Sequence, residues 1–213
     1  TAISEQWTEK DFEEIKNNIS TELALALKEN RANISDQNRE KLKQAFVETI
    51  KNKESSDDRR EAAIHALVSL EGKNVFANID ALKELGLTSE IKDGATTLTD
   101  SKGTSYQFKL DANDKPRLER IDRADKSYRV NKFDEKDNFT GAEEVVEGGN
   151  KLTIDRDNNI TEVKKPNGDF IRLGTTADGK PNGVFDNHGN GWFSNDGGES
   201  WTRMGSGDKA YGK

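Results

Sequence analysis

The chain has 213 residues, of which 31% are hydrophobic and 34% are charged, and its formal net charge at pH 7 is −7. The apolar share lies below the roughly 45% of an average domain, so we expect a highly soluble folded protein with thin cores. The negative charge opposes non-specific attraction to nucleic acid, and no apolar run approaches the ~20 residues of a membrane span. The chain has no cysteine, which excludes disulfides and thiolate chemistry. We therefore expect no nucleic acid partner and no membrane insertion.

Helical spacing of apolar residues runs from Trp7 to about Leu87. The first stripe is continuous, and Thr8 and Asp11 are placed to cap its start. Its apolar members recur at intervals of three and four: Phe12, Ile15, Ile19, Leu23 and Leu27.

Further stripes with capping and stop signals follow the first one. Ser35 and Asp36 precede a second stripe, Asp58 with Glu61 opens a third, and Gly72 is placed to end it. The run from Lys51 to Arg60 has the composition of a solvated loop between helices. Residues 1–93 are therefore predicted to form a small helical bundle.

After Gly94 the pattern changes to short alternating runs, with turn clusters every 8 to 12 residues. Such spacing is typical of antiparallel hairpins. Residues 94–213 are predicted to be a repetitive antiparallel β meander, which makes the whole chain α+β. Its strand candidates include Ser105 to Leu110, Lys126 to Phe133, Lys151 to Ile154, Thr161 to Lys164 and Asp169 to Leu173.

A repeat is visible within this meander. Three strands each end on an aspartate that opens a turn, and these aspartates, Asp111, Asp134 and Asp155, are 23 and then 21 residues apart. Repeats of this length stack on their neighbours because one unit cannot bury its own face. The stretch from residue 154 to 168 resembles the YD repeat of the Rhs and teneurin families, although Ile154 replaces the tyrosine and Asn158 the turn glycine. This resemblance implies a secreted or surface-exposed β scaffold, of the kind found in bacterial toxin shells.

The most specific motif lies near the end of the chain, where residues 194–201 match Ser-x-Asp-x-Gly-x-Ser/Thr-Trp. This pattern is similar to the Asp-box of sialidases and other secreted β proteins, in which it braces a hairpin and takes no part in catalysis. We expect Asp196 to accept backbone N–H groups and the glycines to tolerate positive φ. The structural turn residues are Ser194, Asp196, Gly198 and Trp201.

Aromatic and amide side chains cluster around this motif. Sugar rings stack on aromatic side chains, and amides and carboxylates bind their hydroxyl groups. The candidate ligand-binding residues are therefore Trp192, Asn190, Trp201 and His188. Burial of both tryptophans as the core of a thin β module is the alternative.

A calcium site and a cofactor site are the remaining chemical alternatives. Asp155, Asp157 and Asn159 have the alternate spacing of a calcium loop, but Ile160 and Pro166 stand where such a loop needs Gly and Glu. An Asx turn is therefore expected there, with no metal. We also expect no cofactor, because the glycine-rich end has no phosphate-loop pattern.

Together these patterns favour a noncatalytic module, secreted or surface-associated, that binds or scaffolds a glycan or a protein. Its location would be extracellular or on the cell surface. The alternative is a secreted bacterial effector or hydrolase fragment with a site around His188, where a lone histidine could serve as a general base. Enzymatic activity is the less favoured of the two.

Overall fold

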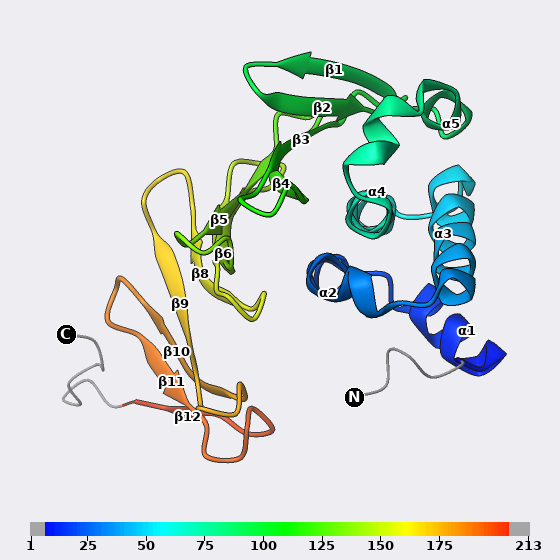
Figure 1. Cartoon of the computed structure of the whole chain (residues 1–213). Coiled ribbons are helices and arrows are strands. Elements are labelled where there is room, and N and C mark those ends of the chain that lie inside the picture. The colour runs from blue at the N-terminus through cyan, green and yellow to red at the C-terminus, as the bar shows by residue number, and fades with distance from the viewer. Residues whose placement is uncertain (1–6, 205–213) are drawn as a thin grey trace. The chain divides into compact units, whose positions relative to one another are not determined.

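The computed structural model describes residues 7–204, in which the helices come first and the strands follow (Figure 1). The predicted α+β class is confirmed. No helix within the described part is long and apolar enough to cross a membrane. The described helical segments are α1 (Glu9–Asn17), α2 (Thr21–Asn30), η1 (Arg31–Asn33), α3 (Asp36–Lys51), α4 (Asp57–Glu71), η2 (Lys73–Ala77) and α5 (Ile79–Glu84).

The described strands form an antiparallel meander whose spatial order follows the chain from β1 to β12. Their bounds are β1 (Thr88–Lys92), β2 (Ala95–Thr99), β3 (Ser105–Leu110), β4 (Pro116–Asp122), β5 (Tyr128–Phe133), β6 (Phe139–Val145), β7 (Lys151–Ile154), β8 (Ile160–Lys164), β9 (Phe170–Thr175), β10 (Pro181–Asp186), β11 (Gly191–Phe193) and β12 (Thr202–Arg203).

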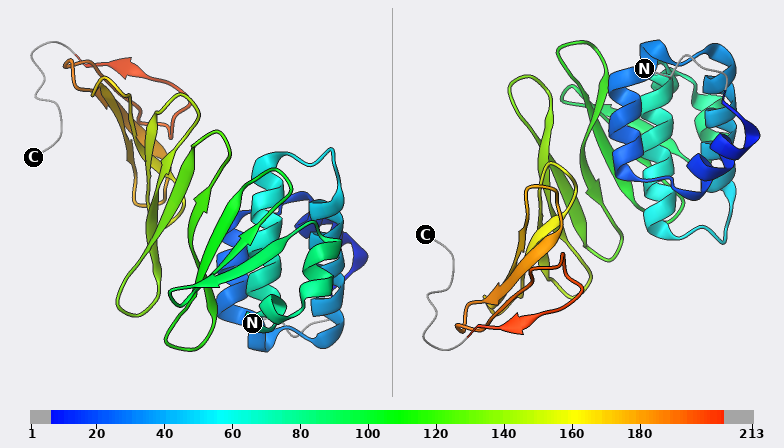
Figure 2. Two further views of the ribbon diagram at one scale, coloured as in Figure 1. Left: turned by 90° about the horizontal axis from the view of Figure 1, so that it is seen from above. Right: turned by 90° about the horizontal axis from the view of Figure 1, so that it is seen from below.

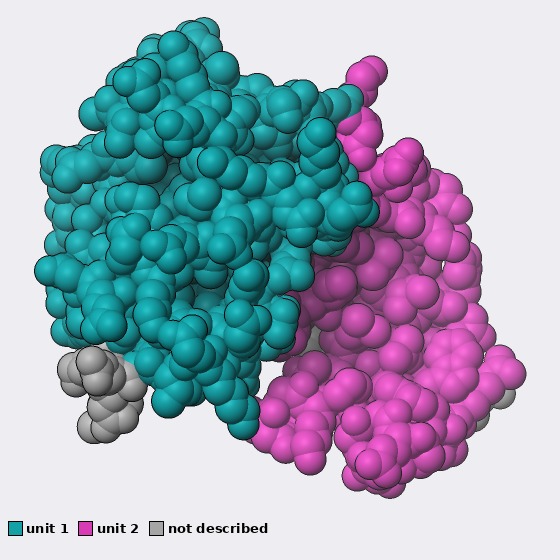
Figure 3. Space-filling view, turned by 90° about the vertical axis from the view of Figure 1, so that its right-hand side faces the viewer, with its two compact units in different colours: residues 1–124, 133–139 teal, residues 125–132, 140–213 magenta. Residues whose placement is uncertain are grey.

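The chain divides into two compact units, coloured separately in Figure 3. The first unit comprises Thr1–Ala124 and Phe133–Phe139, and the second comprises Asp125–Lys132 and Thr140–Lys213. The boundary expected near residue 93 therefore falls inside the first unit. Strand β1 also precedes that boundary.

The first unit has a single core shared by helices and strands. Phe46 and Leu42 of α3 and Ile64 of α4 belong to the same buried cluster as Tyr106 and Phe108 of β3. Figure 2 shows the helices lying against the early strands, and α4 contacts β4 directly. The helical segment is thus no isolated bundle, because its apolar face is completed by the sheet.

Charged side chains also join helices to strand turns in this unit. The Lys28 Nζ of α2 lies 2.7 Å from the Asp111 Oδ2, and both side chains are buried. Arg123 donates to both carboxylate oxygens of Glu61 on α4, at 2.6 and 2.9 Å. Paired contacts of this kind satisfy charges that burial would otherwise leave without solvent.

The first apolar stripe is carried by two helices, although its continuity predicts one. The Asn18 side chain donates to the Glu14 carbonyl at 2.8 Å, and the Ser20 hydroxyl caps α2 by accepting from the Leu23 N–H. Such side chains compete with the helical hydrogen bonds of the backbone, so α1 ends at Asn17 and α2 begins at Thr21. The predicted capping box of Thr8 and Asp11 is present.

Helix α4, which corresponds to the third predicted stripe, starts earlier than expected. Ser56 is its N-cap, so the helix includes Asp57 to Arg60, which the sequence placed in a solvated loop. The Arg60 guanidinium is buried because it donates to the Asn52 and Ser55 carbonyls and pairs with Asp57. The predicted stop at Gly72 is confirmed.

The hairpin turns repeat one geometry. In each turn, the first residue donates its backbone N–H to the carbonyl of the residue four positions later, and the fourth residue donates its N–H to the carbonyl of the first. Turns of this kind begin at Asp100, Asp111, Asp134, Val146, Asp155, Lys165 and Thr176. The fourth residue has positive φ and is a glycine in several turns, but Asp114, Asp137 and Asn158 in others. The turns recur once per strand, so the repeat of 23 and 21 residues spans two strands.

The C-terminal half of the meander has almost no core. The last buried apolar side chain among the described residues is Ile154. Beyond it, only Gly191 and Ser194 are buried within the described part of the chain. Strands β8 to β12 therefore form a layer that has no buried apolar side chain among the described residues.

Candidate binding surface

The exposed layer carries a continuous row of apolar side chains on one face. Residues opposite each other in neighbouring strands lie on the same face. The register pairs Leu152 with Val163, Val163 with Ile171, Leu173 with Val184, and Val184 with Trp192. Ile171 and Leu173 are two residues apart in β9 and join the two rows. We call this set the apolar ladder: Leu152, Val163, Ile171, Leu173, Val184 and Trp192.

The opposite face of the same strands mixes charged side chains with the aromatic side chains of Phe170, Phe185 and Phe193. There Thr153 pairs with Glu162, Glu162 with Arg172, and Arg172 with Phe185. The Arg172 Nε donates to the Glu162 Oε2 at 2.7 Å, and its guanidinium stacks on Phe170. This face therefore places charges among its aromatic side chains, whereas the ladder is a row of apolar side chains alone.

The ladder is partly exposed, although its members are apolar. Trp192 keeps 37% and Ile171 keeps 39% of its surface accessible, and the other four side chains are half-buried. A sheet needs packing on at least one face to be stable on its own. Contiguous apolar surface of this kind marks interaction sites in soluble proteins.

The turn at residues 194–201 follows β11 directly and is held by its own polar side chains. The buried Ser194 hydroxyl accepts the Gly198 N–H at 2.8 Å and donates to the Asp196 Oδ1 at 2.7 Å. Asp196 also accepts the Ser200 N–H at 2.9 Å. Hydrogen bonds from the Ser200 hydroxyl and backbone, and then from Ser194, hold the pKa of Asp196 far below its usual range. The aspartate thus serves as an ionised brace.

Trp201 completes this turn by donating its indole N–H to the Gly198 carbonyl at 3.1 Å. Its ring remains 39% exposed. The alternative in which both tryptophans form a buried core therefore does not describe the structure. Resemblance to the Asp-box family remains a prediction.

The polar candidates Asn190 and His188 are engaged within the chain. The Asn190 amide donates to the Asp186 Oδ2 at 2.8 Å and accepts from Arg203 at 3.3 Å. The His188 Nε2 lies 3.0 Å from the Asp169 Oδ1. Hydrogen bonds from Asn187 and Asn167, followed by the charge of His188, keep the pKa of Asp169 below its usual value.

His188 and Asp169 line a small pocket of about 120 Å³ in the second unit. The pocket is also lined by the ladder residues Val163 and Ile171. Its lining contains no serine, threonine or cysteine, so the described residues supply it with no hydroxyl or thiol nucleophile. The sequence grouped His188 with Trp192, Asn190 and Trp201, whereas the structure places it in a pocket with the ladder residues Val163 and Ile171.

The calcium-like spacing at Asp155 forms a turn. Its Oδ1 accepts the N–H groups of Asp157 and Asn159, each at 2.9 Å, which is the expected Asx turn. Within residues 7–204, no cluster of three or more histidine, aspartate or glutamate side chains is arranged to hold a metal ion.

Most of the ladder was missed when the sequence was considered alone. The signal was available as the alternation of apolar and polar residues in Ile171-Arg172-Leu173 and in Leu152-Thr153-Ile154. Alternation predicts that one face is apolar, but it cannot show whether that face is covered. Comparison of the chain with protein-family models and with curated proteins found no match.

Proposed function

We propose that this chain is a noncatalytic binding module whose second unit recognises a protein partner through the apolar ladder. The observation that carries the proposal is a row of six apolar side chains, two exposed and four half-buried, on a sheet in which no described apolar side chain beyond Ile154 is buried. An apolar sheet face gains stability when another apolar surface covers it, at about 25 cal/mol per Å² removed from water. The resemblances to YD repeats and to the Asp-box support an extracellular or cell-surface location.

A protein is favoured over a glycan because the amide of Asn190 and the carboxylate of Asp169 are already hydrogen-bonded within the chain. Sugar recognition needs amides and carboxylates that are free to bind hydroxyl groups. The Asn190 amide is bonded to Asp186 and Arg203, and Asp169 accepts from Asn167, Asn187 and His188. Apart from Trp192, the ladder offers aliphatic side chains, which suit a partner that buries its own apolar residues.

The test starts from proteins captured on the immobilised full chain, which are identified by mass spectrometry and then purified. Binding of each candidate to the chain is measured by titration calorimetry at several temperatures. We expect a negative heat-capacity change, because apolar surface leaves water. The Ile171→Lys variant should weaken binding at least tenfold, whereas Arg172→Gln on the opposite face should change it less than twofold.

Ile171 is 39% exposed, so the fold should survive its replacement; equal thermal melting of both variants and the wild type is the control. Equal loss of binding in the two variants would contradict a ladder-specific interaction. So would full binding by Ile171→Lys.

A glycan remains the second candidate, because two tryptophan rings are exposed on adjoining segments. Binding of the chain to a polysaccharide array, lost in Trp192→Ala and Trp201→Ala while Ile171→Lys binds normally, would favour it. Hydrolase activity abolished by His188→Ala would favour the effector alternative. Neither result is expected.

A further inference from the structure

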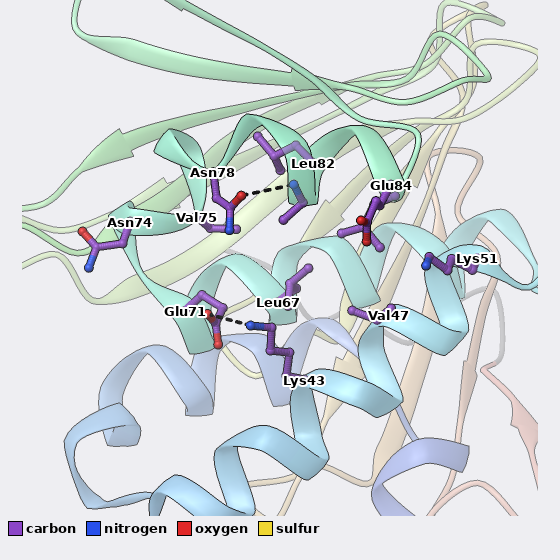
Figure 4. Close-up of a pocket in the computed structure, with 12 residues that line it drawn as sticks. Lys43, Val47, Lys51, Leu67, Glu71, Asn74, Val75, Asn78, Leu82 and Glu84 are labelled. Carbon is purple, nitrogen blue, oxygen red and sulfur yellow. Dashed lines mark hydrogen bonds and ion pairs between the residues drawn. The ribbon is translucent and has the colours of Figure 1, made fainter.

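A separate groove lies among the helices of the first unit. It has a volume of about 400 Å³ and runs between α3 on one side and α4, η2 and α5 on the other (Figure 4). Leu67 and Leu82 are fully buried at its base, and the remaining apolar lining is half-buried. That remaining lining consists of Val47, Val75, Ala81 and Leu85.

The charges around the groove differ from wall to wall. Lys43, Val47 and Lys51 lie four residues apart on α3, so they form one row about 12 Å long. The opposite wall carries Glu71 and Glu84. Lys43 faces Glu71 at 3.4 Å, and Lys51 and Glu84 lie toward the other end in Figure 4. The charged side chains that line the groove are thus basic on α3 and acidic on α4 and α5, and Lys43 pairs with Glu71 across it.

This arrangement discriminates between kinds of ligand. The volume alone would suit a small molecule, since such sites hold about 300–1,000 Å³. The half-exposed apolar lining, however, would leave a small ligand in contact with water. A small anion or cation would also meet one wall of its own sign.

An amphipathic helix matches both features. Two helical turns span about 11 Å, which is close to the length of the lysine row. Apolar residues at i and i+4 would cover the floor, as in other helix-in-groove complexes. Flanks of opposite sign would pair with the two walls, as flanking charges do in coiled coils.

We propose that this groove binds an amphipathic helix of a partner protein whose two flanks carry opposite charges. The proposal is independent of the ladder, because it concerns the other unit. It predicts selectivity for mixed flanks over uniformly charged ones.

The probes are three labelled helical peptides with the same leucine face. One has a glutamate flank and a lysine flank, one has two glutamate flanks, and one has two lysine flanks. Fluorescence anisotropy with the full chain should show the mixed peptide binding at least tenfold more tightly than either uniform peptide. The variant Lys43→Glu with Lys51→Glu makes both walls acidic, so it should prefer the two-lysine peptide instead.

The matched control is Lys10→Glu with Lys109→Glu, which makes the same change in net charge at two exposed positions outside the groove. It should keep the wild-type preference, and circular dichroism should show the same fold in all three proteins. No measurable binding of any peptide would overturn the proposal, as would a preference that the groove variant leaves unchanged. Binding of dodecanoate without binding of the mixed peptide would overturn it in favour of a small-molecule pocket.

Discussion

At the residue scale, the ion pair of Lys28 with Asp111 is a buried link between a helix and a strand turn. Both side chains are nearly inaccessible, and their charged atoms are 2.7 Å apart. Lys28→Met should lower the free energy of unfolding by about 3 kcal/mol, because it leaves a buried carboxylate without its cation. Urea unfolding measures this change. Lys16→Met, which breaks the exposed pair with Glu48, should cost under about 0.5 kcal/mol.

The same pair makes stability depend on pH in acid. Burial alone would raise the pKa of Asp111, but hydrogen bonds from Lys28 and from the backbone of Lys115 and Asn113 hold it below its usual value. The unfolded chain therefore binds a proton first, near pH 4, and the stabilisation is lost as the pH falls further. The stability gap between wild type and Lys28→Met should shrink between pH 5 and the folded pKa. A gap that stays constant would contradict this assignment.

Among the described residues with positive φ, Lys126 alone is neither glycine, aspartate nor asparagine, the residue types that adopt this conformation most easily. Lys126 has a φ of 69°, which costs a residue with a Cβ roughly 1–2 kcal/mol. Lys126→Gly should therefore raise stability by about 0.5 kcal/mol, after the entropy of glycine in the unfolded chain is subtracted. Thermal unfolding would test this. Lys136→Gly, at an exposed turn residue outside the positive-φ set, should lower stability instead.

At the element scale, the Asp-led turns set the positions of the strands. The Asp155 carboxylate accepts two backbone N–H groups, so Asp155→Ala should destabilise the second unit by about 1 kcal/mol. Asp157→Ala in the same turn is the matched control. The Asp157 carboxylate is exposed to solvent and makes only a weak contact, of 3.9 Å, with the Arg156 Nε. Hydrogen exchange of the β7 and β8 amides would detect the difference. Equal exchange in the two variants would show that the turn does not depend on the aspartate.

Local chemistry explains which elements could be predicted from the sequence. The strand Ser105–Leu110 and the helix end at Gly72 were predicted because alternation and glycine act within a few residues. The break between α1 and α2 was missed because the apolar stripe continues across Ser20 while the backbone does not. Arg60 was assigned to a loop because its buried carbonyl partners cannot be inferred from charge alone.

At the scale of the whole molecule, the two units bury apolar surface very differently. The first unit joins helices and strands around Phe46, Tyr106 and Phe108. The second leaves its apolar ladder exposed. The candidate site was predicted only in part, since Trp192 belongs to the ladder and the pocket beside it includes His188. The other ladder residues lie on separate strands, and only the register brings them together.

Site-specific photo-cross-linking tests the role of the ladder most directly. A benzophenone-bearing residue is placed at Ile171 in one version of the full chain and at Arg172 in another, and both are irradiated in the cells that make the protein. These neighbours point to opposite faces of β9. The account predicts a protein adduct from position 171 and none from position 172. Equal adducts from both positions, or an adduct from position 172 alone, would contradict it.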